Sequence, residues 1–78
     1  MALRVEFTVE PFTDGAPGPH VLAAVEAARA HGLAVDFGPF GTEVTGDDDG
    51  QVLAAVSGVL QAALAAGAER VSLQVSKG

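Results

Sequence analysis

The sequence predicts a single α+β domain in which two strand–helix–strand units form one four-stranded sheet. Three observations support this prediction: apolar residues alternate with polar ones in three stretches, two alanine-rich stretches have helical spacing, and glycine or proline stands at the breaks. A chain of 78 residues suffices for one domain, residues 1–78, and lies near the lower size limit for a core without disulfides or metals.

The first element is a strand over residues 3–10. Its odd positions are apolar and its even positions are polar, which is typical of a strand with one buried face. Pro11 ends the strand, and residues 12–18 are rich in the glycine and proline of loops. The apolar positions are Leu3, Val5, Phe7 and Val9.

A helix is predicted to begin at Pro19 and to end at Gly32. Proline suits the first helical position, where an N–H would have no partner, and Gly18 is an acceptable N-cap. Gly32 fits a left-handed cap, and His31 before it suits the negative end of the helix dipole. The apolar stripe of this helix consists of Val21, Leu22, Val25 and Ala28.

Residues 33–46 are predicted to form a hairpin. Its middle, Gly38-Pro39-Phe40-Gly41, cannot be strand, because Pro39 has no N–H and a fixed φ, and because glycine opens other conformations. Phe40 would then lie at the turn, where a large apolar ring is uncommon without a use. The residues on the apolar side of the first hairpin strand are Leu33, Val35 and Phe37.

A second helix is predicted after the hairpin. Asp48 as N-cap and Gln51 three residues later would make a capping box, and the neighbouring aspartates complement the helix dipole. Gly67 is predicted to end this helix. The apolar stripe consists of Val52, Val56, Val59 and Ala63, and it is widened by Leu53, Leu60 and Leu64.

The resulting order is βαββαβ. Right-handed crossovers in both units give an antiparallel four-stranded sheet with both helices on one face, which is the ferredoxin-like sandwich. In the last strand, Val71, Leu73 and Val75 face the helices. The opposite face of the sheet is polar and is predicted to meet solvent or a second copy; its residues are Arg4, Glu6, Thr8, Glu10, Asp36, Ser72 and Gln74.

Composition excludes several classes of function. There are no cysteines, so disulfides and thiolate metal sites are absent. The net charge of −6, with four Lys plus Arg, argues against nucleic acid and anionic membranes as partners. No apolar run reaches membrane-spanning length and the N-terminus lacks signal-peptide features, so we expect a cytoplasmic protein. The small, alanine-rich core leads us to expect a homo-oligomer.

No catalytic or metal-binding constellation is evident. The run Asp47-Asp48-Asp49 lacks the spacing of a calcium loop and fits helix capping better. His20 and His31 have no clustered ligands and are predicted to be exposed, and the remaining carboxylates form no pair fixed by spacing. We therefore predict a protein that is not an enzyme and that holds no metal or cofactor.

One corner of the predicted sheet could bind a small molecule. Since the first strand pairs antiparallel with the third, the end of one lies near the start of the other. Two rings, a carboxylate and hydroxyl groups there suit a flat, positively charged heterocycle, although the alternative, that both rings merely close the end of the core or form a dimer contact, stays open. The residues brought to this corner are Thr8, Glu10, Phe12, Phe40, Gly41 and Thr42.

Three segments resemble the YkoF-like thiamine-binding family. They are Val5-Glu6-Phe7-Thr8-Val9-Glu10-Pro11, the hairpin Gly38-Pro39-Phe40-Gly41-Thr42-Glu43-Val44-Thr45-Gly46-Asp47, and Ala66-Gly67-Ala68-Glu69-Arg70-Val71. The resemblance covers essentially the whole chain, and its most specific part is the hairpin pattern Gly-x-x-Gly-Thr-x-Val-x-Gly-Asp. Where many relatives carry His in the second helix, this chain has Leu60, and relatives tend to continue beyond the position of Gly78.

The resemblance implies a ferredoxin-like fold, a homo-dimer or homo-tetramer, and non-catalytic binding of thiamine or its hydroxymethylpyrimidine part in the cytosol. It assigns the ligand to the hairpin positions Gly38, Pro39, Phe40, Gly41 and Thr42, and Gln74 joins them as a geometric candidate. Whether the ligand is thiamine, a phosphate ester or the pyrimidine alone stays open at this point. The alternative function is an oligomeric regulatory or assembly module without a thiamine ligand.

Overall fold

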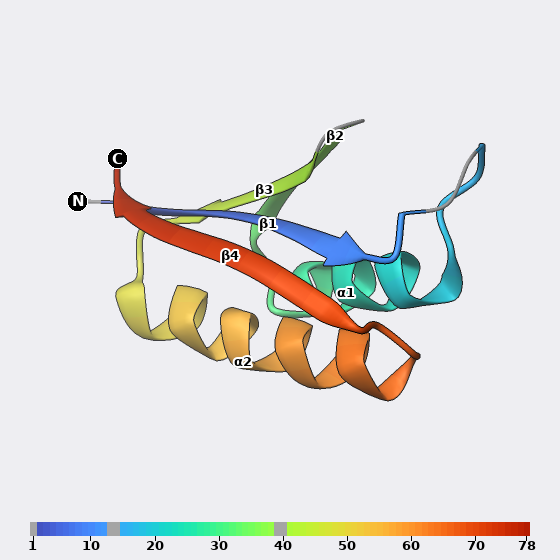
Figure 1. The fold of residues 1–78 in the computed structure, drawn as a ribbon. Coiled ribbons are helices and arrows are strands. Elements are labelled where there is room, and N and C mark those ends of the chain that lie inside the picture. Colours follow the sequence, from blue (N-terminus) through green and yellow to red (C-terminus); the bar gives the residue numbers. More distant parts are fainter. Residues whose placement is uncertain (1, 13–14, 39–40) are drawn as a thin grey trace.

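The computed structural model describes residues 2–12, 15–38 and 41–78 and shows six elements (Figure 1). Their order confirms the predicted βαββαβ pattern. They are β1 (Leu3–Glu10), α1 (Pro19–Ala30), β2 (Ala34–Gly38), β3 (Gly41–Gly46), α2 (Asp49–Ala65) and β4 (Arg70–Lys77).

The four strands form one antiparallel sheet in the order β2-β3-β1-β4, and both helices lie on the same side of it (Figure 1). This is the predicted ferredoxin-like arrangement. The register places Phe7 between Thr42 of β3 and Leu73 of β4, and Phe37 of β2 completes that row. Side chains in one row share a face, so the sheet has an inner face toward the helices and an outer face away from them.

The core lies between the inner face and the two helices. It is made mostly of valine and alanine, which fits the alanine-rich composition. Packing of small side chains lets the helices approach the sheet and each other closely. The buried apolar residues are Leu3, Val5, Phe7, Val9, Ala24, Val25, Ala28, Val44, Val52, Ala55, Val59 and Ala63.

For several apolar residues, the prediction that they lie in a buried stripe is wrong. Leu22 on α1 is about half exposed, as are Leu53 and Leu64 on α2, since each helix buries only the side that meets the sheet and the other helix. Phe37 and Val75 lie on the predicted inner face but on the two edge strands, where the helices do not cover them fully.

The first turn of α2 confirms half of the predicted capping box. Asp48 Oδ1 accepts hydrogen bonds from the N–H groups of Gly50 and Gln51, at 3.0 and 3.4 Å. The other half is wrong, because Gln51 Nε2 donates instead to the carbonyl of His31, at 2.6 Å. That carbonyl lies at the end of α1, so the amide ties the start of one helix to the end of the other.

We expect Asp48→Ala to lower the free energy of unfolding by about 1 kcal/mol, since it removes the acceptor for two otherwise unpaired N–H groups. Chemical denaturation followed by circular dichroism measures the change. The control is Asp47→Ala, one residue earlier and also exposed. Equal losses from the two variants would contradict a capping role and would indicate a general effect of removing negative charge near the helix.

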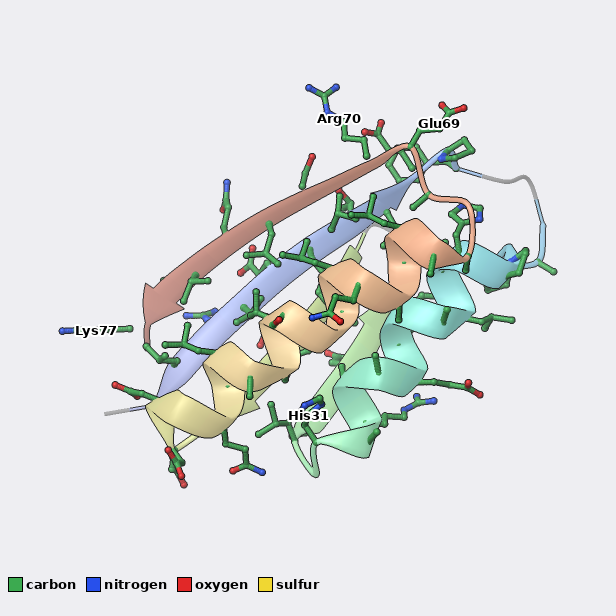
Figure 2. The ribbon with its side chains drawn as sticks, turned by 90° about the horizontal axis from the view of Figure 1, so that it is seen from below. His31, Glu69, Arg70 and Lys77 are labelled. Atoms are coloured by element: carbon green, nitrogen blue, oxygen red, sulfur yellow. The ribbon has the colours of Figure 1, made fainter. Side chains whose placement is uncertain are left out.

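The two histidines differ from the prediction that both are exposed. His20 is buried, with 6% of its surface exposed, and His31 is half-buried next to the α1–α2 contact (Figure 2). Each ring bonds a backbone carbonyl: His20 Nε2 lies 2.6 Å from Pro11 O, and His31 Nδ1 lies 2.9 Å from Ala27 O. A satisfied ring nitrogen lets an imidazole enter a small core at low cost.

Gly32 has a φ of +75°, as predicted for the residue that ends the first helix. Gly67 has a φ of +104° and follows the end of α2. In the described residues, neither helix has the length and apolar character needed to cross a membrane.

Candidate functional site

An apolar cavity of about 560 Å³ opens at the end of the sheet where β1 meets the start of β3. Its walls come from the inner face of the sheet, from the first turn of α1 and from the loop between β1 and α1. The rings of Phe12 and Phe37 are 70% and 42% exposed, so they present apolar surface to a bound molecule. The cavity is lined by Phe7, Thr8, Val9, Phe12, Gly15, Pro17, Val21, Phe37, Gly38, Gly41 and Thr42.

His20 fixes the wall that carries Phe12. Its ring nitrogen bonds the carbonyl of Pro11, the residue directly before Phe12 in the chain. Val21, the residue after His20, lines the cavity from the helix. The buried imidazole therefore joins the β1–α1 loop to the first turn of α1, and it positions both walls relative to each other.

An acidic hollow of about 520 Å³ lies on the outer face of the same end of the sheet. The strand register places Asp36, Glu43 and Glu6 side by side on β2, β3 and β1, with Gln74 of β4 completing the row. Arg4 lies at one margin, with its Nη1 4.0 Å from Glu43 Oε2. Three carboxylates against one guanidinium leave the hollow with a net negative charge that attracts cations.

The apolar cavity and the acidic hollow lie on opposite faces of the same end of the sheet and share five lining residues. Gly38 and Gly41, which pair across the hairpin, line both spaces, and neither has a side chain to separate them. A Cβ on Gly41 would meet Phe7 O at 3.3 Å and Thr8 Cγ2 at 3.4 Å, so the strands are closely packed there. The residues that line both spaces are Phe7, Thr8, Gly38, Gly41 and Thr42.

The structure brings most of the predicted site residues to this corner. Thr8, Gly38, Gly41 and Thr42 line both spaces, Phe12 lines the apolar cavity, and Gln74 lines the acidic hollow. Glu10 lines neither of them, and its Oε2 lies 3.8 Å from Arg70 Nε. Pro39 and Phe40 lie outside the described residues.

Sequence reasoning missed the carboxylate row. It treated Glu6, Asp36 and Glu43 as scattered groups on a polar face, whereas the register aligns them. The signal was present in part, because alternation already placed two of them on the outer face. Their alignment depends on the register between strands, which the spacing within one strand does not define.

The site offers hydroxyl, amide and carboxylate groups next to apolar walls. Over residues 2–12, 15–38 and 41–78, no group of three His, Cys, Asp or Glu side chains has the geometry to hold a metal ion. Thr42 is 5% exposed and, together with Thr8, supplies hydroxyl groups beside the glycine pair. The arrangement suits a flat molecule with one apolar ring and one positive charge.

Solved structures with the same fold come from several bacteria. A domain of unknown function from Bacillus cereus is 25% identical, with a TM-score of 0.73 over 99% of this chain and 76% of that one. A Thermotoga maritima protein proposed to act in thiamine biosynthesis or salvage is 23% identical, with a TM-score of 0.70 over 97% and 81%. A Streptococcus pneumoniae protein is 18% identical, with a TM-score of 0.65 over 100% and 88%.

No curated protein shows a significant match to the chain. A family model, by contrast, matches most of it. The model of the thiamine-binding protein family matches residues 5–76, from the first strand into the last. This range includes every described residue of the apolar cavity and of the acidic hollow. The chain therefore belongs to the thiamine-binding protein family.

Proposed function

We propose that this protein binds thiamine or its hydroxymethylpyrimidine part, and that it does so without transforming the ligand. The observation that carries the proposal is that an apolar cavity and an acidic hollow lie at the same end of the sheet and share lining residues. Family membership supports a thiamine-related role. The ligand-binding residues of the proposal are Thr8, Phe12, Gly38, Pro39, Phe40, Gly41, Thr42 and Gln74, with Glu10 at the margin.

The apolar cavity suits the flat pyrimidine ring. Phe12 and Phe37 both line the cavity and offer exposed ring surface, and aromatic stacking with a heterocycle favours this kind of site. Thr42 offers a hydroxyl that can donate to a ring nitrogen or accept from an amino group. These contacts do not depend on a charge of the ligand.

The acidic hollow suits the thiazolium ring, which has a permanent positive charge. Glu6, Asp36 and Glu43 lie side by side on adjacent strands, and their negative charges attract a cation. The same carboxylates repel a phosphate group. The proposal therefore favours unphosphorylated thiamine over its mono- and diphosphate.

Isothermal titration of the folded protein with thiamine tests the proposal. We expect saturable heat at micromolar ligand or below, which corresponds to a binding free energy of about −8 kcal/mol or more favourable. Titration with the pyrimidine part alone separates the contribution of the apolar cavity from that of the acidic hollow. Absence of heat at millimolar thiamine, from protein shown to be folded, would refute the proposal.

The absence of catalysis is tested in the same samples. Thiamine recovered after long incubation is expected to have an unchanged mass and absorbance spectrum, because the described residues of the site include no recognisable pair of nucleophile and base. A product that disappears when one carboxylate is replaced would indicate an enzyme. The cytoplasmic location and assembly as a homo-dimer or homo-tetramer remain part of this proposal.

A further inference from the structure

The main chain at the end of β1 carries hydrogen-bonding groups that the sheet does not use. The register between β1 and β3 ends at the pair of Phe7 and Thr42, whereas β1 continues to Glu10 and pairs there with β4. Figure 1 shows β3 diverging from the end of β1 toward the hairpin. Beyond Phe7, the side of β1 that faces β3 therefore has no strand partner among the described residues.

The alternation along β1 shows which groups point to that side. At one end of the strand, Ala2 O accepts a hydrogen bond from Gly78 N–H at 2.9 Å. At the other end, Glu10 O accepts one from Glu69 N–H at 2.8 Å. The even-numbered residues of β1 thus turn their N–H and C=O groups toward β4, and the odd-numbered residues turn theirs toward β3. Val9 is the one odd-numbered residue in the part of β1 that β3 does not pair with.

The chain beyond Val9 leaves little else to bond on this side. Pro11, the next odd-numbered residue, has no N–H, and its C=O accepts the hydrogen bond from His20 Nε2 at 2.6 Å. Val9 is 4% exposed and lines the apolar cavity. Buried main-chain groups are nearly always paired, so the N–H and C=O of Val9 are suited to bond a molecule that enters the cavity.

The hydroxyl of Thr42 is a third group without a protein partner. Thr42 lies in one row with Phe7 and Phe37, so its side chain points to the inner face and into the cavity. It is 5% exposed, and in the described part of the chain its hydroxyl makes no hydrogen bond. No fully buried side-chain oxygen or nitrogen there lacks a partner, so the Thr42 oxygen reaches the open space of the cavity.

These groups lie close enough to bond the same small ring. Thr42 pairs with Phe7, which makes it the diagonal neighbour of Val9 across the two strands. Thr8, the other polar side chain of the described lining, alternates with Phe7 and Val9 and therefore points to the outer face. An N–H beside a C=O matches a ring that carries an acceptor next to a donor, such as a ring nitrogen next to an amino group.

We propose that the main chain of Val9 and the hydroxyl of Thr42 recognise the edge of the ligand ring, and that they select a heteroaromatic ring with an amino group next to a ring nitrogen. The Val9 N–H donates to the ring nitrogen, the amino group donates to the Val9 C=O, and the Thr42 hydroxyl bonds another polar atom of the ring. The inference rests on the proposed function, since an aminopyrimidine is such a ring, and it names the groups that select it.

The same geometry disfavours an extended peptide as the ligand. A strand that adds to β1 needs free N–H and C=O groups at every second residue. Pro11 has no N–H, and its C=O is already bonded to His20, so Val9 alone could pair with such a strand. The contacts with Val9 and Thr42 also need no charge on the ligand, and selection by them is independent of the acidic hollow.

Hydrogen exchange of single amides, followed by NMR, tests the contact with Val9. In the free protein, the Val9 N–H is expected to exchange at least about tenfold faster than the Phe7 N–H, which belongs to the pair with Thr42. Saturation with 4-amino-2-methylpyrimidine should slow the exchange of Val9 until it approaches that of Phe7. A Val9 amide as protected as Phe7 in the free protein, or one that stays unprotected at saturation, would overturn the proposal.

Analogue rings separate this inference from the proposed function. In 2,4-dimethylpyrimidine a methyl group replaces the amino group, so this ring should bind about tenfold more weakly, at a pH where both rings are uncharged. Equal affinity for the two rings would overturn the inference even if thiamine binds. If the aminopyrimidine binds and protects Val9 while thiamine does not bind, the proposed function fails and the inference stands. No binding of the aminopyrimidine at millimolar concentration would refute the inference.

Thr42→Val tests the hydroxyl. The variant should weaken binding of 4-amino-2-methylpyrimidine about fivefold. It should leave the midpoint of denaturant unfolding unchanged or raise it, because the hydroxyl has no protein partner to lose. The matched control is Thr45→Val on the outer face of the same strand, which should keep the affinity within about twofold of wild type. Unchanged affinity in Thr42→Val, or an equal loss in both variants, would overturn the assignment of Thr42.

Discussion

Phe7→Ala is expected to lower the free energy of unfolding by about 3–5 kcal/mol, and denaturant titration should show the unfolding midpoint at a much lower denaturant concentration. Phe7 is the largest side chain of the buried core and is 4% exposed. Its loss removes transfer free energy and leaves a cavity that valine and alanine neighbours are too short to fill. A small domain has only about 5–10 kcal/mol of stability in total.

Phe12→Ala is the matched control, because it removes the same ring from an exposed position. Phe12 is 70% exposed, so we expect the free energy of unfolding to change by no more than about 0.5 kcal/mol. Comparable losses from both variants would contradict the assignment of Phe7 to the core and of Phe12 to the cavity wall. The two variants therefore compare the loss of the same ring from a buried and from an exposed position.

The order and the ends of the elements could be predicted from the sequence, because local physics defines them. Alternation in β1 persists for its full length, Pro19 and Gly32 flank α1, and Asp48 caps α2. Each of these signals acts within one turn or one strand. The ferredoxin-like topology then follows from the order of the elements and the handedness of crossovers.

Burial around the helices could not be predicted as well, because it depends on how each helix is rotated against its neighbours. Because leucines widen the apolar stripe of α2, the sequence does not indicate which side of the helix stays exposed. Contact with His31 through Gln51 and Gly58 orients the helix and leaves Leu53 and Leu64 exposed. These are contacts between distant parts of the chain.

The burial of His20 has a similar cause. Its position near the start of α1 suggested exposure, and only the return of the chain at Pro11 supplies the carbonyl that makes burial favourable. The hydrogen bond joins residues nine positions apart through an irregular loop, so no periodic pattern in the sequence indicates it. The residue that positions the cavity wall was therefore invisible to pattern analysis.

The location of the site was partly predictable. Antiparallel pairing of the first and third strands brought Thr8 and Thr42 to one corner before their geometry was known. The two faces of that corner were not distinguished, since a single pocket had been expected. The register divides it into an apolar cavity on the inner face and an acidic hollow on the outer face.

Glu6→Gln together with Asp36→Asn is expected to weaken thiamine binding about a hundredfold at low salt. Each carboxylate about 6 Å from a cation, at an effective dielectric constant of about 40, contributes on the order of 1.4 kcal/mol. The two substitutions leave Glu43 and its contact with Arg4 in place. Binding of the uncharged pyrimidine part should change by less than about threefold, because the apolar cavity holds it without a charge.

The control for this prediction removes the same charge from elsewhere on the surface. Glu26→Gln with Asp47→Asn lowers the net negative charge equally, at exposed positions that line neither the apolar cavity nor the acidic hollow. Measured at the same low salt, this variant should weaken thiamine binding far less, because charges distant from the ligand contribute little. Equal weakening by both double variants would show that only the overall field attracts thiamine. If Glu6→Gln with Asp36→Asn weakened the binding of thiamine and of the pyrimidine part equally, the two carboxylates would support the shape of the site and would not act through the charge of the ligand.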